Sequence, residues 1–322
     1  MVNASTTMFK KRRKMITPTD FWNTVIAFPV VPFRGNTPDY SGFRKNVDYL
    51  LANNWLDQNR PRVLGFGGGS LIHHLQPEEQ LRLVEEMCAA GGDQAAVMAG
   101  IIPTPTGQAN QILASQAKLS HPPDAHLLIP VVGITNPQGI FETLFDFCEE
   151  NGRSLGTRFF LYLRNRLQLE AMARLVRECE YVLGVKVGTE LADVRTLVKL
   201  IGNYGIVMWG IGDCAVSGIK QGAIGHTAGS ATLFVQASDK MNNAYRQGDW
   251  EKARSIEQEL TAFEDLRFVK DRAYNYSTLV AAAKLGGFSD IDCGEGAPFN
   301  AMPPRHIIDQ IRIQVEKLKL YH

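Results

Sequence analysis

Short apolar segments alternate with helix-length amphipathic segments along most of this chain, and this alternation restricts the possible folds more than any other feature. Such alternation is typical of a parallel sheet covered by helices. Eight strands are predicted, at residues 24–29, 62–66, 95–101, 125–130, 158–163, 182–187, 206–209 and 223–226. Helices are predicted between them at 40–53, 77–90, 107–119, 137–150, 168–179, 191–201 and 213–221.

Eight strand–helix units within about 230 residues match a closed (β/α)8 TIM barrel, which is the predicted α/β fold. An open, doubly wound sheet is the alternative. After the eighth strand the chain stays helical, with helices predicted at 250–269, 276–284 and 305–318. The predicted organisation is a flexible N-terminal extension at 1–18, a barrel at 19–232 and a C-terminal helical extension at 233–322 that packs on the barrel.

Composition and charge narrow the class of partner. The chain has 322 residues, 45% of them hydrophobic, which is enough for a large buried core. Its formal charge of +1 favours neither nucleic acid nor an anionic membrane, and no apolar stretch is long enough to span a bilayer. The five cysteines lack CxxC spacing, which fits a reducing compartment. We therefore expect a cytoplasmic protein that binds neither nucleic acid nor membranes.

Lys186 is the strongest indication of function, because it stands in the apolar run 182–187 of a predicted buried strand. A cation among apolar neighbours loses hydration, so its pKa falls and the neutral amine can attack a carbonyl carbon. The alternative is a lysine at a strand end whose ammonium reaches water or pairs with Glu190. The strand alone does not decide between these two interpretations.

The predicted barrel brings further polar residues to the same edge, because barrel enzymes carry their reactive groups at the carboxyl ends of the strands. Tyr162 lies near the end of the fifth strand, and the glycine-rich segment 67–70 directly follows the second. Alternate residues face opposite sides of a sheet, so Tyr162 and Arg164 share one face of their strand. We expect the phenol of Tyr162 and the amine of Lys186 to meet across a small pocket.

The chain resembles the dihydrodipicolinate synthase / N-acetylneuraminate lyase family of class I, Schiff-base barrels. The resemblance is carried, in order along the chain, by Phe28-Pro29-Val30-Val31-Pro32-Phe33 with Asp39, by 65–70, and by Ala99-Gly100, Leu161-Tyr162, Gly184-Val185-Lys186, Gly212-Asp213 and Gly222-Ala223-Ile224-Gly225. It implies a barrel with a helical tail and a homo-oligomer, either a dimer or a tetramer.

In that family the lysine of the sixth strand forms an imine with a 2-oxo acid, commonly pyruvate, and the tyrosine of the fifth strand relays protons. The resemblance implies Lys186 as the nucleophile and Tyr162 as the acid–base group. Imine formation requires proton transfer to the departing oxygen, so both roles fit the chemistry of these side chains. Arg164 resembles the arginine of the Tyr-x-Arg motif in the 5-dehydro-4-deoxyglucarate dehydratase branch, and we expect it to bind a substrate carboxylate. Arg166 in that role, or a solvated arginine at either position, is the alternative.

Two segments differ from the family pattern. Members usually carry Gly-Thr-Thr-Gly-Glu after the second strand, where this chain has Gly-Gly-Gly-Ser-Leu at 67–71. We expect the amides of Gly68 and Gly69 and the hydroxyl of Ser70 to bind the keto-acid carboxylate; a tight turn toward the next helix is the alternative. The tyrosine pair that many synthases place after the fourth strand is absent at 130–133, which makes dihydrodipicolinate synthase activity proper doubtful. His73 and His74 are alternative proton carriers.

Other motifs are excluded by spacing or assigned to structure. The glycine loop does not match GxGxxG or Gly-x-Ser-x-Gly, and no HExxH or histidine–carboxylate cluster supports a metal. We therefore expect no cofactor. Thr227 is a candidate hydrogen-bond donor to the substrate or a helix cap. Asp213 and Ser230 are predicted helix N-caps, and Phe160 and Trp209 are predicted to fill the barrel.

The predicted function is a Schiff-base-forming lyase, an aldolase or dehydratase, that acts on a small-molecule 2-oxo acid such as pyruvate or a keto-deoxy sugar acid. One alternative is dihydrodipicolinate synthase proper, which condenses pyruvate with aspartate semialdehyde. The other is a barrel that has lost catalysis and serves as a ligand-binding or scaffold protein. Cleavage, condensation and dehydration all pass through the same iminium or enamine, so the sequence does not choose among them.

Overall fold

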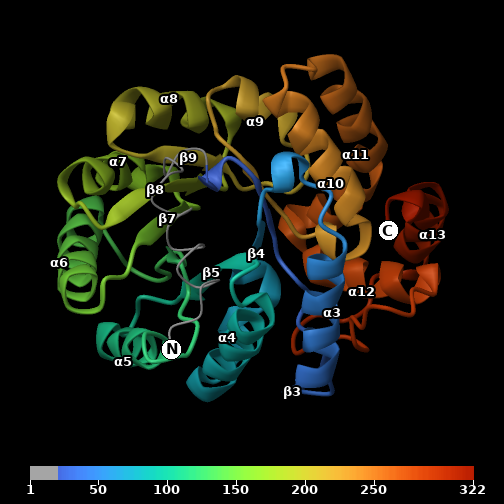
Figure 1. The fold of residues 1–322 in the computed structure, drawn as a ribbon, viewed down its shortest axis with the longest axis horizontal. Coiled ribbons are helices and arrows are strands. Elements are labelled where there is room, and N and C mark those ends of the chain that lie inside the picture. The colour runs from blue at the N-terminus through green and yellow to red at the C-terminus, as the bar shows by residue number, and fades with distance from the viewer. Residues whose placement is uncertain (1–20) are drawn as a thin grey trace.

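The computed structural model describes residues 21–322, and its centre is a closed barrel of eight parallel strands (Figure 1). The barrel strands are β1 (Val25–Ala27), β4 (Arg62–Phe66), β5 (Ala95–Ile101), β6 (Ala125–Leu128), β7 (Phe159–Leu163), β8 (Val182–Val187), β9 (Ile206–Trp209) and β10 (His226–Ala228). The barrel closes because β1 pairs with both β4 and β10. The predicted TIM barrel is therefore confirmed, and the open sheet is excluded.

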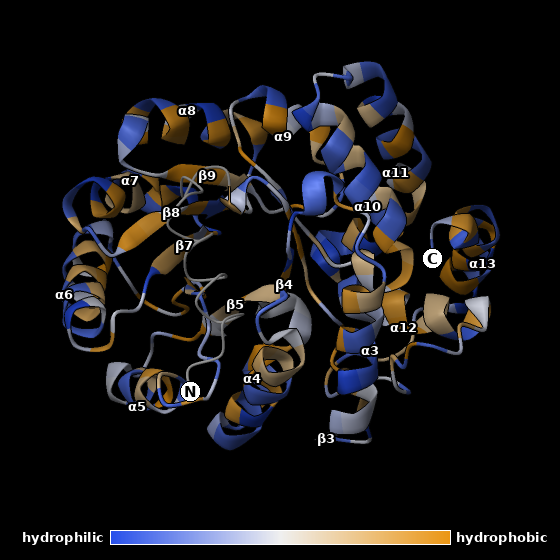
Figure 2. Ribbon diagram, viewed as in Figure 1, coloured by the Kyte–Doolittle hydropathy of each residue, from blue (hydrophilic) through white to orange (hydrophobic). Residues whose placement is uncertain are grey.

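A helix follows every strand of the barrel and packs outside it (Figure 1). These helices are α3 (Tyr40–Ala52), α4 (Pro77–Gly91), α5 (Thr106–Gln116), α6 (Pro137–Leu155), α7 (Leu169–Glu178), α8 (Leu191–Ile201), α9 (Val216–Lys220) and α10 (Ala231–Arg246). Side chains cap two of these helices: Asp39 accepts from the amide of Gly42 before α3, and Asn136 accepts from that of Gly139 before α6. Figure 2 shows that outer helices such as α4 and α8 carry apolar residues on one side and polar residues on the other.

Shorter elements connect these units. A two-stranded antiparallel sheet, β2 (Phe33–Arg34) with β3 (Thr37–Pro38), precedes α3. Single turns of 3-10 helix occur at η1 (Asp57–Asn59), η2 (Gly68–Ser70), η3 (Ile72–His74), η4 (Arg166–Gln168) and η5 (Gly202–Tyr204).

The C-terminal part is helical, as predicted, and lies beside the barrel next to α10 (Figure 1). It consists of α11 (Trp250–Arg272), α12 (Asn275–Gly286), α13 (Arg305–Leu318) and the final turn η6 (Lys319–Tyr321). The boundary expected after residue 232 falls inside α10, which completes the eighth unit of the barrel. The extension expected at 1–18 lies outside the described residues. Within residues 21–322, no helix combines the length and apolar character needed to cross a membrane.

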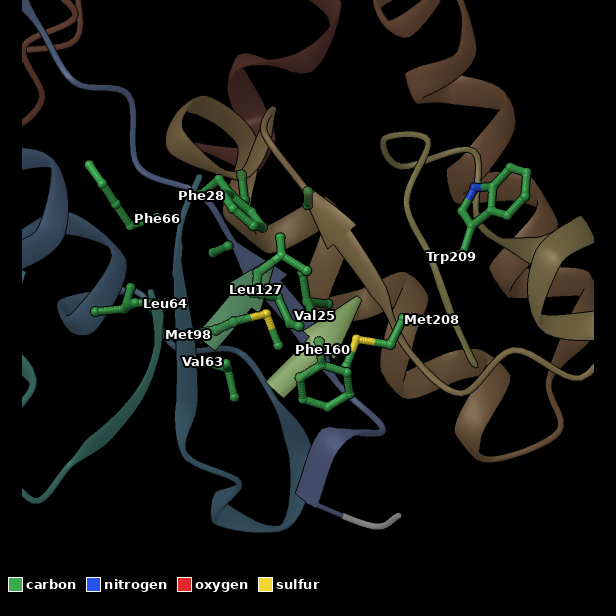
Figure 3. Packing of buried hydrophobic residues seen from close by; sticks show 14 of the residues in the cluster. Val25, Phe28, Val63, Leu64, Phe66, Met98, Leu127, Phe160, Met208 and Trp209 are labelled. Atoms are coloured by element: carbon green, nitrogen blue, oxygen red, sulfur yellow. The ribbon is translucent and has the colours of Figure 1, made fainter. Parts of the chain in front are cut away.

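The strand register determines which side chains fill the barrel. Phe160 is paired with Leu127 on one side and Gly184 on the other, and Figure 3 shows Phe160 together with Leu127, Met98 and Met208 in one interior cluster. Trp209 points away from this cluster, and its ring packs on Gly218 of α9. The prediction that Trp209 fills the barrel is therefore wrong, because it follows the inward Met208 and alternate residues face opposite sides.

The last strand begins three residues later than predicted. Gly225 has a φ of +84°, and a Cβ there would lie 2.6 Å from the carbonyl oxygens of Trp22 and Thr24. The chain turns at this close approach, so regular pairing with β1 begins at His226. Thr227 consequently lies within β10 and not on the following loop.

The two predicted N-caps have other partners. Helix α9 begins only at Val216, and Asp213 is a fully buried carboxylate 3.1 Å from Nε2 of His226. Ser230 precedes α10, but its hydroxyl donates to Asp213 and accepts no amide of the helix. Both capping predictions are wrong. The two side chains are buried, so each needs a hydrogen-bond partner, and they bond to each other.

Candidate active site

Lys186 lies near the carboxyl end of β8, inside the mouth of the barrel. It is paired with Tyr162 of β7 and Met208 of β9, so the three side chains share the inner face. Nζ of Lys186 lies 4.3 Å from the centroid of the Tyr162 ring and 4.8 Å from that of the Phe28 ring, and the residue is only 8% exposed. The amine is thus held between two aromatic rings.

The alternative interpretation of Lys186 does not describe this geometry. Glu190, its expected partner at the strand end, pairs with Arg166 instead. Across the part of the chain that the structure describes, Lys186 forms no ion pair with a carboxylate. An amine that is buried and lacks a compensating negative charge is shifted toward its neutral form.

Burial therefore lowers the pKa of Lys186 from its ordinary value, and the nearby Arg164 guanidinium lowers it further, while Tyr162 acts in the opposite direction. Both the loss of hydration and a neighbouring positive charge disfavour the ammonium. A larger neutral fraction at neutral pH is the property that a Schiff-base nucleophile requires.

Replacing Arg164 by glutamine is expected to raise the pKa of Lys186, because a neighbouring positive charge is removed. The titration of Lys186 can be followed by 13C NMR of labelled lysine Cε, which requires no substrate. Arg177→Gln, at an exposed arginine of α7, is the matched control and should leave this titration unchanged. An unchanged or lowered pKa in the Arg164 variant would contradict the electrostatic coupling.

Two glycines leave room for the side chains of Tyr162 and Lys186. A Cβ at Gly188 would lie 2.6 Å from the Tyr162 ring, and a Cβ at Gly210 would lie 2.8 Å from the Lys186 side chain. Only glycine therefore permits these close approaches. The sequence reasoning missed both positions, although a glycine just past the end of a barrel strand was the available signal.

The predicted arginines occupy different environments. Arg164 is exposed, and its guanidinium lies 3.4 Å from the hydroxyl of Tyr162 without a carboxylate partner in the range 21–322. Arg166 pairs with Glu190 and with Asp193, whose carboxylate lies 3.0 Å away. Arg164 is thus the arginine that remains available beside the lysine and the tyrosine.

The glycine segment forms a turn and also lines a cavity, so its two interpretations are compatible. Gly68 and Gly69 belong to the single turn η2 and border a cavity of about 180 Å³ that Phe28 also lines. Ser70 is fully buried, and its hydroxyl accepts from the amide of Gly67. The structure therefore places the two glycines at the cavity and Ser70 behind them.

Thr227 lies below this cavity. It is paired with Ile26 of β1 and is 5% exposed, whereas the cavity is bordered by Phe28 and Gly229, each two residues farther along its own strand. The structure therefore brings Lys186, Tyr162 and Arg164 together at the mouth and leaves Thr227 one layer deeper in the barrel.

The cavity has walls that the sequence reasoning missed. Phe28 follows β1, and Arg267, Arg272 and Asn275 come from α11 and the start of α12 in the C-terminal extension. No local pattern marks these side chains, because they reach the cavity only when the extension packs beside the barrel. Among the described residues, no group of three or more histidine, cysteine or acidic side chains is arranged to bind a metal.

The fold and the site define a (β/α)8-barrel protein with a buried lysine at the carboxyl ends of its strands. Residues 162–295 match the family described as Dihydrodipicolinate synthetase family. The chain thus has a distant likeness to the dihydrodipicolinate synthase family over the C-terminal half of its barrel and the segment that follows.

Similar proteins include two whose names are "Probable 5-dehydro-4-deoxyglucarate dehydratase". The protein from Cereibacter sphaeroides is 26% identical over 275 residues, and that from Allorhizobium ampelinum is 27% identical over 274. Each alignment covers 82% of this chain and 86% of the relative. Dihydrodipicolinate synthase from Bacillus clausii superposes with a TM-score of 0.82 at 19% identity, covering 94% of this chain and all of that structure. This last likeness shows the fold alone.

Proposed function

We propose that this protein is a Schiff-base-forming lyase that acts on a 2-oxo acid such as pyruvate or a keto-deoxy sugar acid. The observation that carries the proposal is the amine of Lys186, which is buried between the rings of Phe28 and Tyr162 and has no carboxylate partner within residues 21–322. A structural lysine would be expected to reach water or a counter-charge.

In the proposed reaction the neutral amine of Lys186 attacks C2 of the 2-oxo acid. The Nζ–C2 bond forms as the carbonyl π bond breaks, and one amine proton passes to the oxygen to give a carbinolamine. A second proton, from Tyr162, releases that oxygen as water and leaves a protonated imine. The Tyr162 phenolate then accepts the proton that C3 loses as the enamine forms.

The same enamine serves an aldolase and a dehydratase, because an aldolase makes or breaks the C3–C4 bond through it, whereas a dehydratase uses it to expel a hydroxyl from C4, which leaves as water once protonated. The names of the similar dehydratases support a keto-deoxy sugar acid as substrate. Arg164, which lies beside Tyr162 and has no carboxylate partner in the described chain, supports recognition of an acidic substrate. The homo-oligomer and the cytoplasmic location are further proposals that rest on the family likeness.

The test is reductive trapping with borohydride, followed by intact-mass measurement and peptide mapping. We expect a stable adduct on Lys186 with at least one member of a panel containing pyruvate, 2-oxobutyrate and 5-dehydro-4-deoxyglucarate. Protein treated with borohydride alone is the control. No adduct with any of these compounds would favour the non-catalytic barrel.

A parallel assay separates the synthase alternative. Condensation of pyruvate with aspartate semialdehyde would indicate dihydrodipicolinate synthase proper. We expect this assay to fail while trapping succeeds, because residues 130–133, which follow β6, contain no tyrosine.

A further inference from the structure

A cavity at the barrel mouth, next to Phe28, has one wall from the barrel and one from the C-terminal extension. Phe28, Gly68 and Gly69 border it on the barrel side, while Arg272 and Asn275 border it from the extension. Phe28 connects the cavity with the lysine, since its ring lies 4.8 Å from Nζ. The cavity volume of about 180 Å³ is several times the ~30 Å³ that one water molecule occupies in the liquid, so the cavity has room for a small organic acid.

The charge of this cavity favours an anion. Its lining contains two arginines and two asparagines, and no acidic side chain of the described residues borders it. Gly68 and Gly69 contribute no side chain, and a Cβ at either position would meet open space. The barrel wall therefore carries no charged side chain, and the charged groups come from the extension.

Arg267 is held in place by hydrogen bonds, and its positive charge is compensated by the carboxylate of Glu264. It is 4% exposed, and its guanidinium donates to the carboxylate of Glu264 at 2.5 Å and to Oδ1 of Asn275 at 2.6 Å. A Cβ at Gly229, the residue after β10, would lie 2.5 Å from this guanidinium, so glycine there leaves room for Arg267. Because Oδ1 of Asn275 accepts from Arg267, the amide nitrogen of Asn275 is left to donate to another acceptor.

Arg272 differs from Arg267 because it has no acidic partner in the described part of the chain. Its guanidinium donates one hydrogen bond, of 3.0 Å, to the carbonyl oxygen of Gly188, two residues after Lys186. A guanidinium has five N–H donors, so most of them remain for a ligand. Arg272 is half-buried at the cavity wall and carries an uncompensated positive charge.

The backbone that presents Arg272 is strained. Lys270, Asp271 and Arg272 have φ values of +50°, +53° and +72°, and none of them is glycine. Residues other than glycine adopt such conformations at a cost in free energy, so they persist only where the surroundings impose them. This strain lies at the junction of α11 and α12, which is the point where the extension reaches the barrel mouth.

We propose that the C-terminal extension supplies the carboxylate-binding side chains of the site. Arg272 and the amide nitrogen of Asn275 bind a carboxylate of the 2-oxo acid, and the backbone amides of Gly68 and Gly69 complete its coordination from the barrel side. The planar fork of an arginine matches a carboxylate in two parallel hydrogen bonds. The inference rests on the proposed function for the identity of the ligand, but its test can be separated from it.

The test compares pyruvate with pyruvamide, a ketone of similar size that lacks the carboxylate. In Arg272→Gln, we expect the concentration of pyruvate that half-saturates borohydride trapping to rise about 10- to 100-fold, because a charge-assisted bidentate contact is lost. The half-saturating concentration of pyruvamide should stay within about twofold of its wild-type value, because pyruvamide has no carboxylate to lose that contact. Arg312→Gln, at an exposed arginine of α13 in the same extension, is the matched control and should change neither value.

Two outcomes overturn the inference while leaving the proposed function intact. One is an unchanged half-saturating concentration of pyruvate in Arg272→Gln. The other is an equal rise in the half-saturating concentrations of pyruvate and pyruvamide, which would indicate a disturbed loop at Gly188. Circular dichroism and the melting temperature check that the variant is folded.

If the wild-type protein traps no oxo acid, the proposed function fails and the subsite is tested by direct binding. Lactate keeps the carboxylate and cannot form an imine, so its binding can be measured by ligand-observed NMR. Binding to the wild type that is lost in Arg272→Gln supports the subsite alone. Equal binding to both proteins, or none to either, overturns it.

Discussion

Replacing Lys186 by arginine is expected to abolish the borohydride-trapped adduct and to slow turnover of the 2-oxo acid by roughly a thousandfold or more. Arginine keeps the positive charge and similar length, but its guanidinium stays protonated and is no nucleophile. Intact mass after trapping and the turnover rate under saturating substrate measure the two effects.

Lys199→Arg provides the matched control for this experiment. Lys199 is an exposed lysine of α8, the helix that follows the strand carrying Lys186, and its replacement should leave both the adduct and the rate unchanged. An adduct of undiminished yield in Lys186→Arg, mapped to another lysine, would refute the assignment of Lys186 as the nucleophile. Loss of the adduct together with loss of cooperative unfolding would instead require the same comparison in Lys186→Met.

Replacing Asp239 by alanine is expected to lower the free energy of unfolding by roughly 3–5 kcal/mol, which is the usual effect of breaking a buried ion pair. Arg62 of β4 and Asp239 of α10 are 1% and 0% exposed and share two hydrogen bonds of 2.8 and 2.6 Å. Asp239 also accepts from the amide of Trp55 at 2.9 Å. Removal of the carboxylate leaves a buried guanidinium without its counter-charge.

Urea unfolding of Asp239→Ala beside Asp48→Ala measures this difference. Arg44 and Asp48 form an exposed pair on α3, and loss of that pair should cost no more than about 0.5 kcal/mol. The double variant Arg62→Met, Asp239→Leu should recover most of the loss, because neither charge is then left unpaired. Similar costs for the buried and the exposed pair would show that burial is not what makes the Arg62–Asp239 contact important.

Local patterns predicted much of the barrel. The helix bounds at 191–201 and the strand bounds at 62–66, 95–101, 182–187 and 206–209 agree with the structure, because the apolar runs are continuous where a parallel strand is buried on both faces. The eighth strand was misplaced because its start depends on Gly225, which lies against the backbone of Trp22 and Thr24. No pattern within the strand itself reports that contact.

The candidate site divides in the same way. Lys186 and Tyr162 could be placed on one face from the alternation of their strands, since side-chain direction in a strand depends only on position along it. The capping predictions for Asp213 and Ser230 were wrong because the two side chains bond to each other across a buried contact between different loops. Such pairings depend on which segments meet, and a reading of one segment at a time does not contain that information.

The order of residues along the chain was sufficient to indicate a barrel, a lysine among apolar neighbours and a tyrosine on the adjacent strand, because these features follow from periodicity within single segments. Only the tertiary structure showed that Arg272 and Asn275 border the cavity lined by Phe28, whose ring contacts that lysine. They belong to helices that follow the barrel in sequence, and their approach to Gly68 and Gly69 is produced by packing between distant segments. Packing of that kind depends on the shape of the whole molecule, whereas strand and helix periods depend on neighbouring residues alone.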